Sequence, residues 1–241
     1  MQFAPVLHAE WLKIRTVRSL PGALFALFAA TTAFSAIAGV DGTPDPDLDP
    51  LFTALSGVTP GQIAAVSFGA MAVSAEYHNG ALRLSLAAVP RRGRWFAAKV
   101  TAIAVPTLAV GLLTALAALL VARAGLGEAA SGLTPAEQIR GVVGCAVYLT
   151  LMALFAAGLA TLLRSGVATL SVLIPFILVV SFVIGDAAGT VADFLPDRAG
   201  QVVLYETHDG TLGPWSGLAV TALWTAAALA AGAWSLRRRD A

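Results

Sequence analysis

Long stretches without charge are the feature that most limits what this chain can fold into. The first of them, Leu20 to Val40, holds no charged residue. A helix of about 20 residues, rising 1.5 Å per residue, crosses the roughly 30 Å hydrocarbon core of a bilayer. Comparable stretches recur along the sequence, and they predict six transmembrane spans at approximately residues 20–40, 59–75, 100–121, 140–163, 167–184 and 215–236.

The composition agrees with lipid as the main solvent. The chain is 58% hydrophobic and 12% charged, whereas soluble domains carry about 25% charged residues. The net charge of +1 gives no indication of a nucleic-acid partner. A single cysteine, Cys145, lies within an apolar span, so no intramolecular disulfide can form. We therefore predict an all-α integral membrane protein with one transmembrane domain over residues 1–241.

Charge is strongly segregated between alternate segments. If both termini are cytoplasmic, the inner segments hold twelve Lys and Arg against three acids, and the outer segments hold three against eleven. Lys and Arg near span ends resist translocation, so this distribution predicts six spans with both termini inside. Arg outnumbers Lys thirteen to two, which favours a GC-rich bacterial source and hence the cytoplasmic membrane as location.

The segment from Glu76 to Lys99 is the most basic part of the predicted inner face. Five of the fifteen Lys and Arg residues lie in it. Pro90 is expected to end a short helix before the cluster formed by Arg91, Arg92 and Arg94. The apolar residues Leu82, Leu86 and Val89 recur at helical spacing and could enter a groove on a partner. An alternative is that the arginines only orient the chain and contact anionic lipid.

Residues 1–19 predict an amphipathic helix lying at the membrane interface. The expected interfacial residues are Trp11, Lys13, Arg15 and Arg18, with Glu10 on the otherwise apolar side. A flexible basic flank that merely orients the first span is the alternative.

Several local signals predict where helices begin and bend. Thr59-Pro60-Gly61-Gln62 and Thr134-Pro135-Ala136-Glu137 each offer a cap, a proline at the first helical position and a side chain that can reach back to the cap. Pro175 is expected to interrupt the fifth span, and residues 185–214 to form short helices at the outer surface. Spacings such as Gly57-xxx-Gly61 establish no packing motif in so Ala- and Gly-rich a chain.

No catalytic or cofactor-binding pattern is present. The sequence lacks HExxH, GxSxG and the Walker A pattern, and its three histidines fall on different segments. Every charged residue lies at or outside a predicted span boundary, which disfavours an ion-coupled carrier because such carriers need an intramembrane carboxylate. We expect no enzyme activity, no metal and no cofactor in this chain.

Four stretches resemble the six-span permease subunits of ABC-2 type ATP-binding cassette transporters. They are HAEWLKIRTVRS (8–19), AEYHNGALRLSLAAVPRRGRWFAAK (75–99), LPDRAGQ (195–201) and GLAVTALWTAAALAAGAWSLRRRDA (217–241). The family usually has an Arg-His-Gly-Thr type sequence after Glu-Tyr, where this chain has His78, Asn79, Gly80 and Ala81.

The resemblance implies a permease subunit that exports a substrate together with a second permease subunit and two separate ATPase subunits, which hold ATP and Mg²⁺. It also implies that the interfacial helix and a coupling helix after the second span dock on the ATPase. The expected docking residues are Glu76, Tyr77, Gly80, Leu82, Arg83, Leu86, Arg91, Arg92 and Arg94. An ATP-independent channel or facilitator, and a membrane scaffold or sensor subunit that transports nothing, stay open as alternatives.

Overall fold

The computed structural model describes residues 3–40, 49–77, 80–126, 133–180, 189–207 and 210–238, and these residues form helices and short connections with no strand. Five helices in them are long and apolar enough to cross a membrane, which indicates a multi-pass membrane protein. They are α2 (Ser19–Val40), α4 (Val58–Ser74, continued by the 3₁₀ turn η1, Ala75–Tyr77), α6 (Arg92–Leu126), α7 (Pro135–Leu163) and α11 (Pro214–Arg238).

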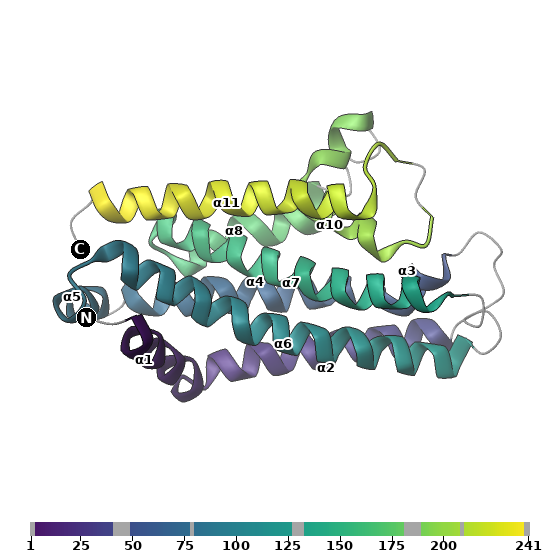
Figure 1. Cartoon of the computed structure of the whole chain (residues 1–241), viewed down its shortest axis with the longest axis horizontal. Helices are drawn as coiled ribbons and strands as arrows, with labels where there is room; N and C mark the ends of the chain where they lie inside the picture. Colours follow the sequence, from purple (N-terminus) through teal and green to yellow (C-terminus); the bar gives the residue numbers. More distant parts are fainter. Residues whose placement is uncertain are drawn as a thin grey trace.

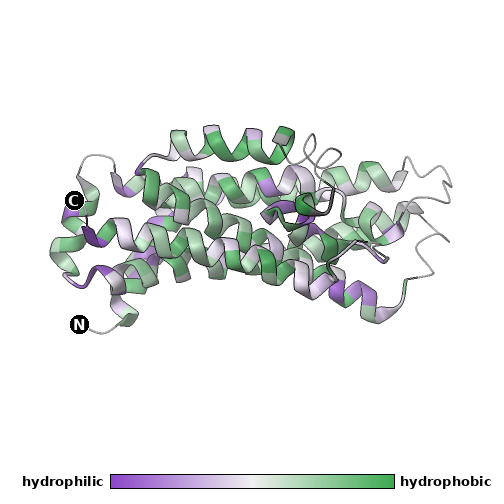
Figure 2. Ribbon diagram, turned by 90° about the horizontal axis from the view of Figure 1, so that it is seen from above, coloured by the Kyte–Doolittle hydropathy of each residue, from purple (hydrophilic) through white to green (hydrophobic). Residues whose placement is uncertain are grey.

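The long helices run side by side in one bundle with α7 at its centre (Figure 1). Helix α7 packs against α4, α6 and α11, while α2 packs against α4 and α6. In the apolar 18-residue stretch of α7, 67% of the residues are buried, compared with 28% in the corresponding stretch of α2. Apolar residues cover the length of the bundle, and hydrophilic residues gather mainly toward its ends (Figure 2). This is the distribution expected when lipid surrounds the middle of the bundle.

The first, fourth and sixth predicted spans agree with α2, α7 and α11. The third is longer than predicted, because α6 begins at Arg92, within the basic cluster. The fifth consists of α8 (Gly166–Pro175) and a π-helical turn η3 (Phe176–Val180). The change of helix type directly after Pro175 confirms the predicted interruption, and residues 181–188, which complete this predicted span, lie outside the described residues.

Of the two predicted caps, one is confirmed and one is wrong. Thr134 accepts a hydrogen bond from the Glu137 amide, and Glu137 accepts one from the Thr134 amide, so a capping box opens α7. Helix α4, in contrast, begins at Val58 after Gly57, with no side-chain cap. The helix α3 (Pro50–Leu55) leads directly into it, and the Gln62 side chain accepts from Tyr148 instead of reaching back to Thr59.

Gly57 and Gly61 allow α4 to lie directly against α2. A Cβ atom on Gly57 would come within 1.9 Å of the Thr31 carbonyl oxygen, and one on Gly61 within 2.0 Å of the Thr31 hydroxyl. The two backbones therefore meet at a distance that no larger residue would permit. The Gly57-xxx-Gly61 spacing, which by itself established no packing motif in the sequence, therefore lies at a contact between α2 and α4.

Three short helices lie between η3 and α11, as predicted for residues 185–214. They are η4 (Gly189–Phe194), α10 (Pro196–Gln201) and η5 (Val202–Leu204). Val203 and Leu204 are fully buried. Arg140 of α7 donates a hydrogen bond of 2.8 Å to the Tyr205 carbonyl, and the Tyr205 ring stacks on Phe52 with centroids 4.3 Å apart. These contacts fold the segment back onto the bundle.

The predicted inner segments meet at one end of the bundle. Helix α1 (Phe3–Thr16), helix α5 (Ala81–Ala88) and the last turns of α11 lie together there (Figure 1). Arg92 at the start of α6 donates a hydrogen bond of 2.6 Å to the Leu236 carbonyl near the end of α11. The basic segments that the sequence assigned to the same side of the membrane therefore lie close together in space.

Candidate functional site

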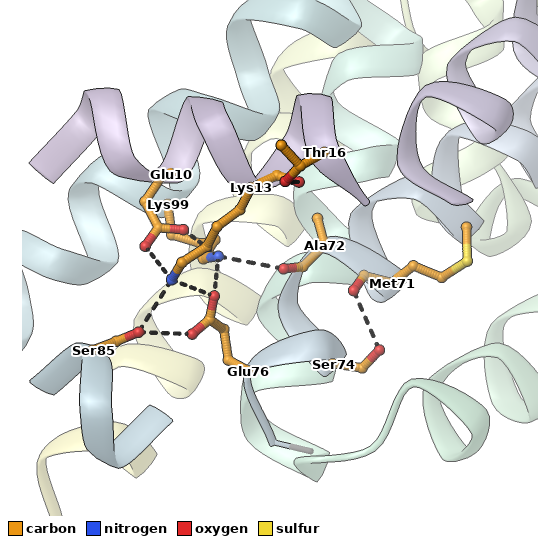
Figure 3. A network of polar contacts seen from close by, with 9 residues as sticks. All are labelled: Glu10, Lys13, Thr16, Met71, Ala72, Ser74, Glu76, Ser85 and Lys99. Atoms are coloured by element: carbon orange, nitrogen blue, oxygen red, sulfur yellow. Dashed lines mark hydrogen bonds and ion pairs between the residues drawn. The ribbon is translucent and has the colours of Figure 1, made fainter. Parts of the chain in front are cut away.

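Four charged side chains form a buried cluster where α1 crosses the bundle (Figure 3). Lys13 of α1 donates hydrogen bonds to Glu10, at 2.9 Å, and to Glu76 of η1, at 2.8 Å. Lys99 of α6 donates to the same Glu76 oxygen at 2.7 Å and also forms an ion pair with Glu10. Two carboxylates and two ammonium groups from three segments thus alternate around one site.

Ser85 of α5 completes the cluster. Its hydroxyl donates to Glu76 at 3.0 Å and accepts from Lys13 at 3.1 Å. The Lys99 ammonium also lies 3.5 Å from the Ala72 carbonyl and 5.7 Å from the centre of the Trp95 ring. The charges consequently connect α1, the end of α4, α5 and α6.

Burial makes the balance of charge in the cluster important. Glu10, Glu76 and Lys99 are each only 2–3% exposed. Removing an ion from water costs several kcal/mol, which the cluster offsets only because each buried charge is paired and hydrogen-bonded. The loss of one member would leave an excess charge of the opposite sign among side chains that are largely buried.

Lys13 is the member of the cluster nearest to solvent. Partial burial acts to lower the pKa of its ammonium group, but the hydrogen bonds and charges of Glu76 and Glu10 outweigh burial and raise this pKa above its usual value. Lys13 therefore carries a full positive charge at neutral pH. The stability that its pairing contributes is lost only as the pH rises beyond the ordinary range of lysine.

An open groove of about 650 Å³ lies directly above the cluster, between α1 and α5. Val6 and Ala9 of α1 form one wall, and Leu84 and Ala88 of α5 form the other. Leu84 is 74% exposed although it is a large apolar residue. Glu10, Lys13 and Ser85 also line the groove, so it combines apolar walls with a charged floor.

The charge cluster accounts for the position of Glu10 on the otherwise apolar side of the predicted interfacial helix. Glu10 lies on the apolar side of α1 because that side faces the buried Lys99, whereas Arg15 and Arg18 are exposed. Trp11 is half-buried. Glu76 pairs with two basic residues, Lys13 and Lys99.

The apolar strip predicted to enter a partner's groove points inward instead. Leu82 is 4% exposed and packs with Trp95 of α6 and Leu236 of α11, and Leu86 and Val89 cover the same small core. Leu82 is therefore covered by this chain itself, whereas Leu86 and Val89 are half-buried and their contact with a partner stays a prediction. The apolar face of a short helix at the end of a span has to be buried, and here Trp95 and Leu236 of the same chain bury it.

The remaining predicted docking residues divide into anchors and exposed groups. The Tyr77 hydroxyl donates to the Thr161 carbonyl of α7 at 3.3 Å. Gly80 has φ of +71°, a left-handed conformation that suits glycine at the start of α5. Arg83 and Arg91 are exposed, whereas Arg94, like Arg92, is half-buried near the start of α6.

Sequence reasoning missed two members of the site, Ser85 and Lys99. Lys99 was recognised only as part of a basic segment, although Trp95 and Lys99 are one helical turn apart at the start of an apolar span. An acid on the apolar side of one helix and a lysine at the start of another span could have indicated a pair. Ser85 carried no signal that would distinguish it from other hydroxyls.

No model of a known protein family matches this sequence, and no curated protein matches it significantly.

Proposed function

We propose that this chain is the permease subunit of an ABC-2 type ATP-binding cassette transporter in the bacterial cytoplasmic membrane. In this proposal it has six spans with both termini cytoplasmic, pairs with a second permease subunit, and forms a path for export. ATP and Mg²⁺ bind to partner ATPase subunits. The motif resemblance of residues 8–19 and 75–99 supports this proposal.

The single structural observation that carries the proposal is the groove between α1 and α5. The two segments that the resemblance assigns to ATPase docking lie side by side and leave apolar side chains exposed toward the same space. An apolar groove with charges at its base suits a protein partner that inserts a helix or turn. The charge cluster beneath connects the groove to α4 and α6, so movement of a docked subunit would reach the bundle.

Replacing Leu84 with aspartate is expected to remove the ATPase subunit from the purified complex. The substitution places a charge in the centre of the apolar wall, where burial against a partner would cost several kcal/mol. The measurement is the amount of ATPase subunit, and of ATP hydrolysis, recovered with the tagged protein from gently solubilised native membranes. We expect recovery to fall at least about tenfold.

Val191→Asp is the matched control for this experiment. Val191 is 72% exposed, close to the 74% of Leu84, but belongs to η4, away from the groove. It should leave recovery at the wild-type level, and both variants must insert in equal amounts. If no ATPase is recovered even with the wild-type protein, and reconstituted vesicles show substrate flux without ATP, a facilitator replaces the transporter proposal.

The proposed orientation predicts which positions a membrane-impermeant maleimide reaches in whole cells. Cys145 is fully buried, and replacing it with alanine gives a background without cysteine. In that background Thr207→Cys should react in intact cells, and Leu84→Cys only after the membrane is opened. The opposite pattern would reject the orientation with both termini inside.

A further inference from the structure

A second cavity, of about 450 Å³, lies in the half of the bundle farther from α1 and α5. Thr59 and Gln62 of α4 line one side of it, and Ile177 and Leu178 of η3 line another. The remaining wall comes from Phe52 of α3 and from η4, α10, η5 and Tyr205. Its volume is within the range of about 300–1,000 Å³ typical of sites for drug-sized molecules.

A hydrogen-bonded set of three side chains holds the cavity wall in place. The buried Gln62 side-chain oxygen accepts from the Tyr148 hydroxyl of α7 and, at 3.3 Å, from the Gln201 amide of α10. Gln201 also donates to the Tyr148 oxygen at 3.2 Å. Three polar side chains from three helices are therefore joined within an apolar bundle, which keeps the cavity walls in fixed positions.

Among the described residues that line the cavity, acidic groups outnumber basic ones. Two carboxylates, Asp193 and Asp197, and one guanidinium group, Arg198, line it. Asp197 is 3% exposed, and Asp193 accepts a hydrogen bond of 3.1 Å from Thr211. The formal charge of these three groups is −1.

The uncharged lining supplies two further surfaces. The Tyr205 ring, stacked on Phe52, is an aromatic wall of the kind that attracts cations. Ile177, Leu178 and Val202 form an apolar wall on the cavity. A molecule that satisfied the whole lining would carry one positive charge, hydrogen-bond donors and an apolar body.

We propose that this cavity binds an amphipathic organic monocation. Its cationic amine donates to the carboxylate of Asp193, and its apolar body lies against Ile177 and Leu178. The cavity binds such a molecule whether or not the protein is a transporter. Its role as the place from which an exported substrate leaves rests on the function proposed above.

The test measures binding of the fluorescent monocation rhodamine 6G to the full chain in nanodiscs of zwitterionic phosphatidylcholine, with empty nanodiscs subtracted. Asp193→Asn keeps the acceptor for Thr211 but removes the charge, and we expect the Kd to rise about tenfold, the effect of losing one hydrogen bond to a charged group. Arg198→Gln takes the cavity charge from −1 to −2, so we expect several-fold tighter binding. A merely structural role for Arg198 would weaken binding instead.

Glu137→Gln is the matched control, because it removes one acid outside the cavity while glutamine still completes the capping box of α7. It should leave the Kd unchanged. Fluorescein, an anion on the same xanthene frame, should not bind. The proposal is overturned if fluorescein binds as tightly as rhodamine 6G, or if neither Asp193→Asn nor Arg198→Gln changes the Kd.

This outcome is separate from that of the ATPase experiment because the nanodiscs contain no ATPase. Rhodamine 6G binding that depends on Asp193, together with no recovered ATPase, would retain the cation site and reject the transporter. Recovered ATPase without Asp193-dependent binding of rhodamine 6G would retain the transporter proposal and reject the cation site.

Discussion

Replacing Lys99 with methionine is expected to lower the free energy of unfolding by about 3–5 kcal/mol, the usual effect of removing one partner from a buried ion pair. The variant leaves the Glu10 and Glu76 carboxylates buried with Lys13 as their only cation in the cluster. Methionine keeps a long, unbranched side chain at this position but removes the ammonium charge, and with it the cation–π contact with Trp95. The measurement is unfolding of the purified protein by SDS in mixed micelles, followed by tryptophan fluorescence.

A charge-balanced double variant distinguishes this explanation from a simple packing defect. Glu10→Gln together with Lys99→Met removes one charge of each sign and should recover most of the lost stability, giving a large interaction energy in the double-mutant cycle. Arg15→Met, at an exposed position on α1, should change stability by less than about 0.5 kcal/mol. A Lys99→Met variant as stable as the wild type would show that the cluster contributes nothing through its charge balance.

Gly69→Ala is expected to lower the free energy of unfolding by about 3 kcal/mol, at the upper end of the usual cost of overpacking. A Cβ atom at Gly69 would lie 1.9 Å from the Ala153 carbonyl oxygen and 2.7 Å from its carbon. These are backbone atoms of the central helix α7, so no side-chain rotation relieves the clash, and α4 must move away. The same SDS titration measures the effect.

Gly22→Ala is the control for the glycine substitution. A Cβ atom there has no neighbour within 4 Å, and alanine favours helix by up to about 1 kcal/mol relative to glycine. Gly22→Ala should therefore be neutral or stabilising. Equal losses at both positions would mean that helix contact at Gly69 is not the cause.

The charge cluster is also where the two proposals meet. Under the proposed function, a subunit docked between α1 and α5 acts on Lys13 and Ser85, which share hydrogen bonds with Glu76. Glu76 lies at the end of α4, and the far end of α4 contributes Thr59 and Gln62 to the proposed cation cavity. One rigid helix thus connects the docking groove with the cavity.

Much of the helix order could be predicted from the sequence, because each signal is local. An uncharged, mainly apolar stretch of about 20 residues predicted α2, and Thr134 with Glu137 predicted the start of α7. Pro175 predicted the interruption that is found where α8 gives way to η3. Hydrocarbon length, capping hydrogen bonds and the missing proline amide each act within a few residues of the chain.

These local signals could not predict contacts between side chains that are far apart in the sequence. Gln62 was predicted to cap its own helix, but it pairs with Tyr148, 86 residues away. Leu82 was predicted to face a partner, but Trp95 and Leu236 bury it. In both cases the side chain has two chemically acceptable environments, and only the packing of helices decides between them.

By itself, the sequence determined that lipid is the principal solvent of this chain, where most of its helices lie, and which segments carry the basic charge. Tertiary structure alone decided that Glu10, Lys13, Glu76 and Lys99 form one neutral cluster and that a groove remains between α1 and α5. The physical reason is the range of the forces involved. Solvent preference and helix formation are set residue by residue, whereas a buried charge is stable only if helices distant in the chain bring its counter-charge to it.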